Sequence, residues 1–283
     1  MSDRAPVAVV VPVHGRLDLA ERCVRAVDAT TDPAVPLVGV DDHGAERVDD
    51  ALLASWTTSR RAVRLVRNDR NLGFPRTVNR ALAEVPGHHV ALVNSDVVVG
   101  DGWLEELQAV LGDVPAGERV ASATAVANEA SIASVPLPPH TGDAGSVLAA
   151  AERAARRLRA APTDLPRSVH LPVAIGHCVL LHADALAALG GFDEVFSPGY
   201  GEEVDWSMRA VRAGWTHRLA LRCYVLHDGG GSFGRSRSRH EARLLARYPA
   251  QFVRLRLRAR RPGPLREAVA AAAALVGDGP SAR

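Results

Sequence analysis

Cysteine is scarce in this chain of 283 residues. The three cysteines, Cys23, Cys178 and Cys223, stand far apart, and no Cys-x-x-Cys pair occurs. This spacing argues against a disulfide framework and against a cysteine-based zinc site. Isolated thiols are typical of a reducing compartment, so we expect a cytoplasmic protein.

Long hydrophobic runs are also missing. The apolar run near the N-terminus, Val7 to Val11, ends at Pro12 and is too short to span a bilayer. It lacks the basic start and the small-residue cleavage site of a secretion signal. The alanine-rich stretch "EAVAAAAALVG" near the C-terminus is likewise short and only weakly apolar. These features predict a soluble protein without a membrane span.

The chain has no large excess of charge of either sign. Its 34 Lys and Arg residues against 32 Asp and Glu residues give a formal net charge of +2. A charge this small does not call for a polyanionic partner for the whole molecule, and we expect no nucleic acid. At 47% hydrophobic and 23% charged residues, the composition is that of an average soluble domain.

Strand-like and helix-like segments alternate over the first hundred residues. Short, continuous apolar runs are typical of strands that are covered on both faces, and here they predict strands at 7–11, 36–42, 62–68 and 89–96. Helical spacing of apolar residues predicts helices at 17–29, 49–57 and 74–84. This alternation predicts an α/β fold with a mainly parallel central sheet flanked by helices.

The second half of the chain has a different composition. Residues 131–167 are rich in Pro, Gly, Ala and Arg, and within them 144–160 is expected to form an exposed helix. The stretch 173–196 predicts a strand, a short helix and a Gly-Gly turn, and a further strand is predicted around 219–227. From Arg235 onward the sequence is basic and helical in character.

Two of the predicted strands end in acids. Asp41 and Asp42 close the second strand, and Asp96 closes the fourth. Because ligands of parallel α/β sheets bind beyond the carboxyl ends of the strands, these acids outline a site.

A third group of acids stands in "GYGEEVDWSMRA", where Glu202, Glu203 and Asp205 fall within four positions. Like charges this close raise each other's pKa. The simple explanation is a helix N-terminus, where carboxylates complement the free N–H groups and the helix dipole. The alternative is a functional carboxylate.

Seven stretches, taken in order, resemble family 2 glycosyltransferases. They are "VVVPVHGRLDLAERCVRAV", "VDD", "NDRNLGFPRTVNRAL", "LVNSDVVV", "GGFDEVF", "GEEVDWSMRAVRAGW" and "HDGGGSFG". The blocks "NLGF" and "GGFDE" are most similar to bacterial rhamnosyl- and galactofuranosyl-transferase-like members. The resemblance implies a Rossmann-like GT-A domain over residues 1–234. Its nucleotide-sugar-binding half would span about 1–125 and its acceptor-binding and catalytic half about 126–234, followed by a basic helical extension over 235–283.

The resemblance implies that a sugar moves from a nucleotide diphosphate to an acceptor hydroxyl. A diphosphate leaving group needs a divalent cation, and oxygen ligands suit Mg²⁺ or Mn²⁺. Asp96 matches the last acid of the family's Asp-x-Asp motif, and His227 matches a histidine that completes the metal site in related enzymes. Asn94 stands where the first acid is often found, and with Ser95 it is assigned to the nucleotide side. The alternative is that "NSD" only caps the helix that begins near Gly102.

Other positions match the family's nucleotide-binding residues. Asp41 is expected to accept a hydrogen bond from the base, with Asp42 supporting the ribose side or the loop. The remaining matches are the loop after the first strand, with Pro12, Val13 and Gly15, and the helix after "NLGF", with Arg76 and Asn79. Two acids in a polar turn, and a surface arginine paired with a carboxylate, remain the alternatives.

In the family, the acidic block carries the catalytic base. Glu203 takes that place here, with Glu202 beside it, and crowding by Glu202 and Asp205 is expected to raise its pKa. Direct displacement with such a base inverts the anomeric carbon. The acceptor pocket is assigned to Gly176, His177, Asp205 and Trp206. The alternative for the last two is that Asp205 caps or orients the following helix and Trp206 packs beside it.

The resemblance leaves the substrates and the cellular location open. UDP- and dTDP-sugars both fit as donors, and the acceptor is a glycan, a lipid-linked saccharide or a small aglycone. The tail "FVRLRLRARRPGP" interleaves apolar residues with arginines, which is typical of peripheral contact with an anionic membrane. A sugar nucleotidylyltransferase and a non-catalytic sugar-nucleotide-binding protein remain as alternative functions.

Overall fold

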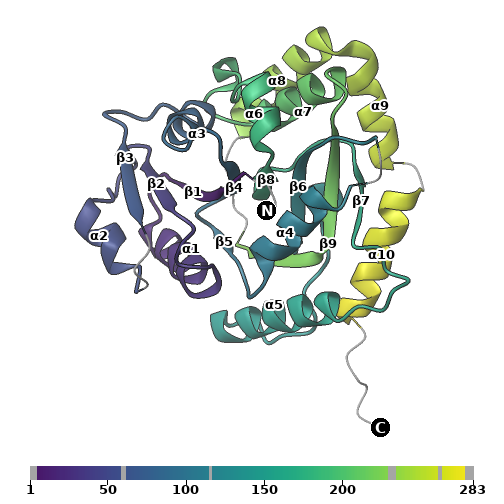
Figure 1. The fold of residues 1–283 in the computed structure, drawn as a ribbon, viewed down its shortest axis with the longest axis horizontal. Coiled ribbons are helices and arrows are strands. Elements are labelled where there is room, and N and C mark those ends of the chain that lie inside the picture. Colours follow the sequence, from purple (N-terminus) through teal and green to yellow (C-terminus); the bar gives the residue numbers. More distant parts are fainter. Residues whose placement is uncertain (1–4, 59–61, 115–116, 229–233, 261–262, 278–283) are drawn as a thin grey trace.

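A computed structural model describes residues 5–58, 62–114, 117–228, 234–260 and 263–277. A nine-stranded sheet runs through the molecule with helices packed on both sides of it (Figure 1). The strand order is β3-β2-β1-β4-β8-β6-β9-β5, and β7 pairs with β9 outside this path. The predicted α/β fold with a central sheet is confirmed.

The first four strands form the parallel part of the sheet. They are β1 (Val7–Val13), β2 (Leu37–Asp41), β3 (Val63–Arg67) and β4 (His89–Val93). Helices α1 (Leu17–Thr30), α2 (Asp50–Ser55) and α3 (Phe74–Leu82) make the connections between them. Both faces of β1 are buried, because its continuous valine run leaves no polar face for solvent. Pro12 and Val13, expected in the loop after this strand, lie in the strand itself.

The second half mixes strand directions. Strand β8 (Cys178–Leu181) inserts between β4 and β6 (Val120–Ala127) and runs antiparallel to both, while β9 (Thr216–His227) is parallel to β6. The mainly parallel arrangement therefore describes the first four strands. The remaining elements are β5 (Val97–Val98), α4 (Trp103–Gly112), the short 3-10 turns at Ser131–Ala133 and Glu194–Phe196, α5 (Ala144–Arg159), β7 (Ser168–Leu171), α6 (Ala183–Leu189) and α7 (Glu202–Arg212).

These directions bring distant segments to one edge of the sheet. Because β8 runs against β4, its first residue Cys178 pairs with Val93, the last residue of β4. Strand β9 ends at the same edge, where His227 pairs with Val97. The carboxyl ends of β1, β2, β4 and β9 and the amino end of β8 thus meet, and most of the predicted site residues follow these ends.

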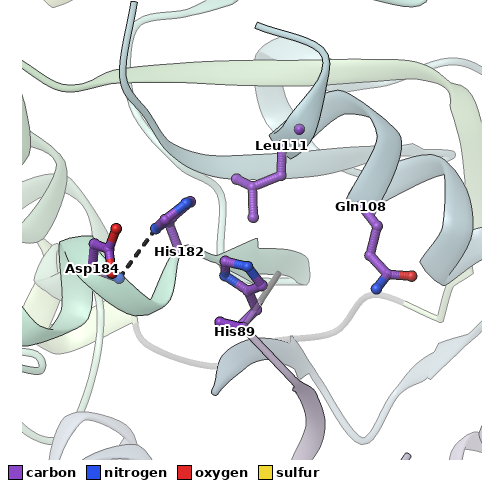
Figure 2. Close-up of a pocket in the computed structure, with 7 residues that line it drawn as sticks. His89, Gln108, Leu111, His182 and Asp184 are labelled. Carbon is purple, nitrogen blue, oxygen red and sulfur yellow. Dashed lines mark hydrogen bonds between the residues drawn. The ribbon is translucent and has the colours of Figure 1, made fainter. Parts of the chain in front are cut away.

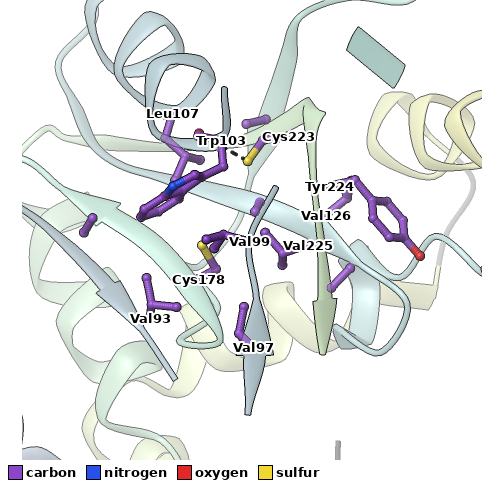
Figure 3. Close-up of a cluster of buried hydrophobic side chains, with 14 of the residues drawn as sticks. Val93, Val97, Val99, Trp103, Leu107, Val126, Cys178, Cys223, Tyr224 and Val225 are labelled. Atoms are coloured by element: carbon purple, nitrogen blue, oxygen red, sulfur yellow. Dashed lines mark hydrogen bonds between the residues drawn. The ribbon is translucent and has the colours of Figure 1, made fainter. Parts of the chain in front are cut away.

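The largest hydrophobic core lies between the sheet and helices α1, α4 and α5. Trp103 is buried in it beside Cys178 and Cys223 (Figure 3), and its indole Nε1 donates to Thr31 Oγ1 at 3.0 Å. All three cysteines are buried as free thiols.

Helix α5 is not the exposed helix expected from its arginines. It buries one face, formed by Ala150, Ala151, Ala154, Ala155 and Leu158. These small side chains let the helix backbone approach the sheet closely, while the arginines occupy the opposite, solvated face.

Three C-terminal helices pack onto this body. They are α8 (Gly234–Arg247), α9 (Pro249–Arg260) and α10 (Pro264–Gly277). Helix α10 buries Ala268, Ala272 and Val276, spaced four residues apart, and contacts α5. Arg261 and the side chains of Arg256, Arg258 and Arg260 lie outside the described residues. Among the helices described, none combines the length and the apolar character needed to cross a membrane.

His217 of β9 makes the stability of this fold pH-dependent. Its ring is buried between Ser122 Oγ, 2.8 Å from Nδ1, and the Ser207 carbonyl, 3.3 Å from Nε2. Burial lowers the pKa of His217 to about 4. The unfolded chain therefore binds a proton that the folded chain resists, and this contribution to stability is present above pH 6.5 and lost as the pH falls towards 4.

We expect the stability difference between the wild type and His217→Asn to shrink by roughly 2 kcal/mol between neutral pH and pH 5, because asparagine does not titrate. Urea unfolding of both proteins across this range measures the effect. A difference that stays constant with pH would contradict it.

Candidate functional site

Asp42 holds the loop after β3 to the end of β2. Its buried carboxylate accepts the backbone N–H groups of Leu72 at 2.8 Å and Gly73 at 3.0 Å, and also Asn68 Nδ2 at 2.7 Å. Asn68 is itself buried, and its side-chain oxygen accepts from Arg80 at 2.7 Å. The carboxylate is thus fully engaged in shaping the "NDRNLGF" loop, and of the two predicted roles these contacts correspond to support of the loop.

Asp41 is covered by a neighbouring arginine. Its carboxylate accepts Arg47 Nε at 2.6 Å and the backbone N–H of His43 at 3.1 Å, and the side chain is almost fully buried. Arg47 is held in turn by the Asn68 carbonyl at 3.2 Å and by His43 Nδ1 at 2.8 Å. No sequence pattern pointed to Arg47, because its side chain meets Asp41 only through the turn that follows β2.

The loop after β1 lies directly against the loop after β2. The backbone N–H of Asp42 donates to the Val13 carbonyl at 2.8 Å, and His14 Nδ1 lies 3.1 Å from the Asp42 carbonyl. A Cβ atom on Gly44 would stand 2.3 Å from the backbone nitrogen of Gly15, so only glycine fits at position 44. Gly15 adopts φ +68°, a left-handed conformation that favours glycine.

Asp96 and His227 face each other across the β5–β9 pairing. Asp96 Oδ2 lies 3.4 Å from His227 Nε2. Nδ1 of the same ring lies 2.6 Å from the Glu129 carbonyl, so Nδ1 carries a proton and Nε2 points at the carboxylate. Burial alone would lower the pKa of His227, but the contacts with Asp96 and Glu129 outweigh it and raise the pKa. The pKa of Asp96 is lowered, because the His227 contact outweighs its burial. This geometry favours a proton or a cation between the Asp96 carboxylate and the His227 ring.

Two buried polar atoms near this pair have no hydrogen-bond partner. They are Asn94 Oδ1 and His177 Nδ1. The His177 ring is stacked 5.6 Å from the His227 ring, and its Nε2 donates to the Ala125 carbonyl at 3.0 Å, which leaves Nδ1 as a free acceptor. Burial lowers the pKa of His177 to about 3, so the ring is neutral. Unpartnered buried acceptors are uncommon, and here they indicate a site that a ligand completes.

The remaining predicted residues at this edge are Ser95 and Gly176. Ser95 follows Asn94 and is partly buried, and Gly176 directly precedes His177. Within the described residues, no group of three or more His, Cys, Asp or Glu side chains is arranged to hold a metal ion, so Asp96 and His227 form a two-residue set. Gly229, Gly230 and Gly231 of the "HDGGGSFG" stretch lie outside the described residues.

Glu202 and Glu203 open helix α7 as a pair. Glu202 is buried, with Oε2 unpartnered, whereas Glu203 is partly exposed and accepts the Gly201 N–H at 3.3 Å. Burial, and then the charge of Glu203, raise the pKa of Glu202 well above its usual value. Burial also raises the pKa of Glu203. The expected rise is present, but for Glu203 its main cause is desolvation and not crowding by the other acids.

Asp205 and Trp206 of α7 are both buried, and their polar atoms are bonded within the chain. Asp205 is completely buried and accepts from Arg209 at 3.0 Å, Arg247 at 2.6 Å and Tyr248 at 2.8 Å. Trp206 is buried in the core, where its Nε1 donates to the Gly190 carbonyl at 3.0 Å. Neither side chain has a free face for an acceptor.

Arg76 and Asn79 of α3 both contact the segment 192–194. Arg76 is exposed and pairs with Glu194 at 3.1 Å, which is the alternative of a surface ion pair. The Asn79 amide brackets Phe192, donating to its carbonyl and accepting from its N–H, both at 2.8 Å. Asn79 therefore anchors the "GGFDE" loop to α3, and its polar atoms are not available to a nucleotide.

A cavity in the described part of the chain lies away from these residues. It has a volume of about 230 Å³ and is lined by His89, His182, Gln108, Leu111 and Asp184, among others (Figure 2). His89 is the first residue of β4, and Asp96 follows the end of that strand. The cavity is therefore at the opposite end of β4 from the Asp96–His227 pair and is separate from the candidate site.

Comparisons with known proteins give the family of the chain. The model of the family described as "Glycosyl transferase family 2" matches residues 8–190. An N-acetylglucosaminyl-diphospho-decaprenol L-rhamnosyltransferase of Mycobacterium tuberculosis is 25% identical over 272 residues, which cover 89% of this chain and 84% of the relative.

Two solved structures share the fold. GalNAc-T7 with UDP, GalNAc and Mn²⁺ aligns with a TM-score of 0.64 and 15% identity, covering 96% of this chain. This chain spans only 55% of the GalNAc-T7 chain. The mannosyltransferase PcManGT from Pyrobaculum calidifontis, in complex with GDP-Man and Mn²⁺, aligns with a TM-score of 0.55 and 17% identity, covering 97% of this chain and 70% of its own.

We expect Asp42→Ala to lower the free energy of unfolding by about 3 kcal/mol, because three buried N–H donors lose one charged acceptor. Urea unfolding measures this loss. The matched control is Asp49→Ala, which removes an exposed N-cap bond to Leu52 and should cost about 1 kcal/mol. Equal losses in the two variants would show that Asp42 does not hold the loop.

Proposed function

Because this chain belongs to glycosyl transferase family 2, we propose that it is a metal-dependent, inverting glycosyltransferase that uses a UDP- or dTDP-sugar as donor. The chain is a glycosyltransferase with the GT-A fold, and its relatives give the class of reaction. The donor, the metal and the stereochemistry are inferences from the site.

The observation that carries the proposal is the Asp96–His227 pair beside the unpartnered Asn94 oxygen. A carboxylate and an imidazole nitrogen whose Nδ1–H is fixed by a backbone carbonyl make a suitable donor set for Mn²⁺. Mg²⁺ prefers oxygen ligands throughout, so the imidazole favours Mn²⁺ over Mg²⁺. When bound, the ion would neutralise charge that develops on the diphosphate leaving group.

The nucleotide would lie along the ends of β1 and β2. The loop of His14 and Gly15 and the cluster of Asp41, His43 and Arg47 flank this region with polar groups. Since the Asp41 carboxylate is covered by Arg47, a base that binds Asp41 must displace or share the guanidinium. A uracil or thymine ring supplies both an N–H donor for Asp41 and carbonyl oxygens for Arg47, which supports a UDP- or dTDP-linked donor.

Glu203 is the proposed catalytic base. It is the more exposed of the two glutamates, so an acceptor hydroxyl can reach it, and its raised pKa suits a base near neutral pH. The acceptor oxygen would attack the anomeric carbon as its proton passes to the Glu203 carboxylate. The bond from that carbon to the phosphate oxygen breaks, and the nucleoside diphosphate leaves from the opposite face. Glu202, whose pKa is higher still, stays protonated and neutral beside the charged base.

A lipid-linked saccharide is the acceptor that we favour. The name of the mycobacterial relative gives an L-rhamnosyl group as the unit transferred and a decaprenol diphosphate-linked sugar as its acceptor. Such an acceptor would place the enzyme at the inner face of a membrane. Val253 and Leu257, exposed one turn apart on α9 beside Arg254, would support peripheral contact with anionic lipid there.

The metal assignment is tested by nucleotide binding. We expect Mn²⁺ to strengthen the binding of UDP or dTDP to the wild type. In Asp96→Asn we expect this increase in affinity to be at least roughly tenfold smaller, because an amide is a weaker metal ligand than a carboxylate. Calorimetric titration of UDP, dTDP and GDP, each with and without Mn²⁺, measures this. Asp184→Asn, at the opposite end of β4, is the matched control and should bind like the wild type. An undiminished Mn²⁺ effect in Asp96→Asn would refute the assignment.

The base assignment is tested by turnover. We expect Glu203→Gln to bind the nucleotide normally and to transfer sugar about 10²- to 10⁴-fold more slowly, since glutamine cannot accept a proton. The wild-type rate should fall as the pH drops through the raised pKa of Glu203. Glu202→Gln, which replaces a neutral acid by a neutral amide, should lose less. A larger loss in Glu202→Gln would transfer the role to Glu202.

A further inference from the structure

The loop in front of the glutamate pair has an unfavourable backbone. Tyr200 adopts φ +79° between Gly199 and Gly201, and Gly201 adopts φ +104°. A non-glycine residue in this region costs of order 1–3 kcal/mol and persists only where its surroundings hold it. Because Glu202 and Glu203 follow directly, the direction of this loop decides where their carboxyl groups point.

His240 of α8 holds the loop through its backbone. Its buried Nδ1 lies 2.9 Å from the Tyr200 carbonyl and 3.2 Å from the Gly199 carbonyl, so Nδ1–H donates to both. The Tyr200 hydroxyl donates to Glu241 of the same helix at 3.1 Å. Helix α8 therefore holds the backbone carbonyls of Tyr200, the strained residue, and of Gly199 before it.

A second contact from the C-terminal helices fixes the first turn of α7. Tyr248 and Arg247 both bond the buried Asp205 carboxylate, and Arg247 also bonds Asp193 at 2.7 Å. A Cβ atom on Gly201 would lie 3.2 Å from Leu244 Cδ1, so α8 packs directly against the start of α7. The loop is thus held at its carbonyls and, one turn later, at Asp205.

We propose that His240 and the Arg247–Tyr248 pair are positioning residues, through which α8 sets the orientation of Glu202 and Glu203. None of the three touches the Asp96–His227 pair, so they act through the loop and not on the metal side. The family model ends at residue 190, and both the glutamate pair and α8 lie beyond it. This inference rests on the proposed function in that it assumes Glu203 to be the base.

The test compares His240→Leu with His240→Asn. Leucine removes the donor, whereas asparagine retains an N–H near the position of Nδ1. For His240→Leu we expect backbone amide exchange across residues 199–206 to rise about tenfold or more, since those amides lose the contact that holds them. With dTDP-L-rhamnose or a UDP-hexose as the donor and with acceptor present, the kcat for release of the nucleotide should fall about 10- to 100-fold. The affinity for UDP or dTDP with Mn²⁺ should stay within about twofold, since the nucleotide side is untouched. His240→Asn should recover most of the rate.

Tyr248→Phe provides a milder version should His240→Leu fail to fold, and is expected to lower kcat about three- to tenfold through one lost hydrogen bond. Val276→Ala on α10 is the matched control, because it removes buried volume from the same C-terminal segment without touching the loop. It should lower stability while kcat stays at the wild-type value.

The outcomes separate this inference from the proposed function. Wild-type exchange and wild-type kcat in His240→Leu overturn the positioning role, and so does an equal kcat loss in Val276→Ala. If His240→Leu raises the exchange while Glu203→Gln turns over normally, positioning of the loop is supported and the assignment of Glu203 as base is refuted.

Discussion

The buried carboxylate of Asp42 is the interaction on which the geometry of the site depends. It collects three N–H donors from residues 68–73 and so fixes the loop that leads into α3. The same loop meets the second half of the chain, because Phe74 N–H donates to the Pro198 carbonyl at 2.8 Å. A Cβ atom on Gly73 would lie 2.6 Å from Pro198 Cα, so the two loops touch through their backbones. Asp42 thereby connects the end of β2 with the loop that carries the glutamate pair.

The acidic residues of the candidate site differ in the groups that surround their carboxyl groups. Asp205 is neutralised by two arginines and a tyrosine hydroxyl, and it serves only to hold α7 in place. Glu202 is buried without a partner for Oε2, and burial favours its neutral form. Asp96 faces the His227 imidazole, an arrangement that favours a cation between them. Chemically similar side chains therefore differ in their partners and in their availability to a ligand, according to what surrounds each of them.

The C-terminal helices pack against α7, the helix that begins with the glutamate pair. A small hydrophobic cluster of Val173, Phe196, Met208, Leu244 and Tyr248 joins α7 to α8 and the start of α9. The His240 contact is buried beside this apolar centre, where a hydrogen bond is stronger than an exposed one would be. The segment that follows β9 is thus part of the structure that presents the glutamates.

The sequence by itself determined the first four strands, the helices between them and the acids at the strand ends, since hydrophobic periodicity and the order of the motifs are local properties. It assigned different roles to Asp41, Asp42 and Glu203, but it could not show the hydrogen-bond partners of these acids or of Asp205. Tyr248 lies 43 residues from Asp205, and Phe192 lies 113 residues from Asn79. The antiparallel insertion of β8, which brings His177 beside His227, has no local signature either. Burial, hydrogen-bond partners and pKa values arise from packing between distant segments, and only the tertiary structure decided them.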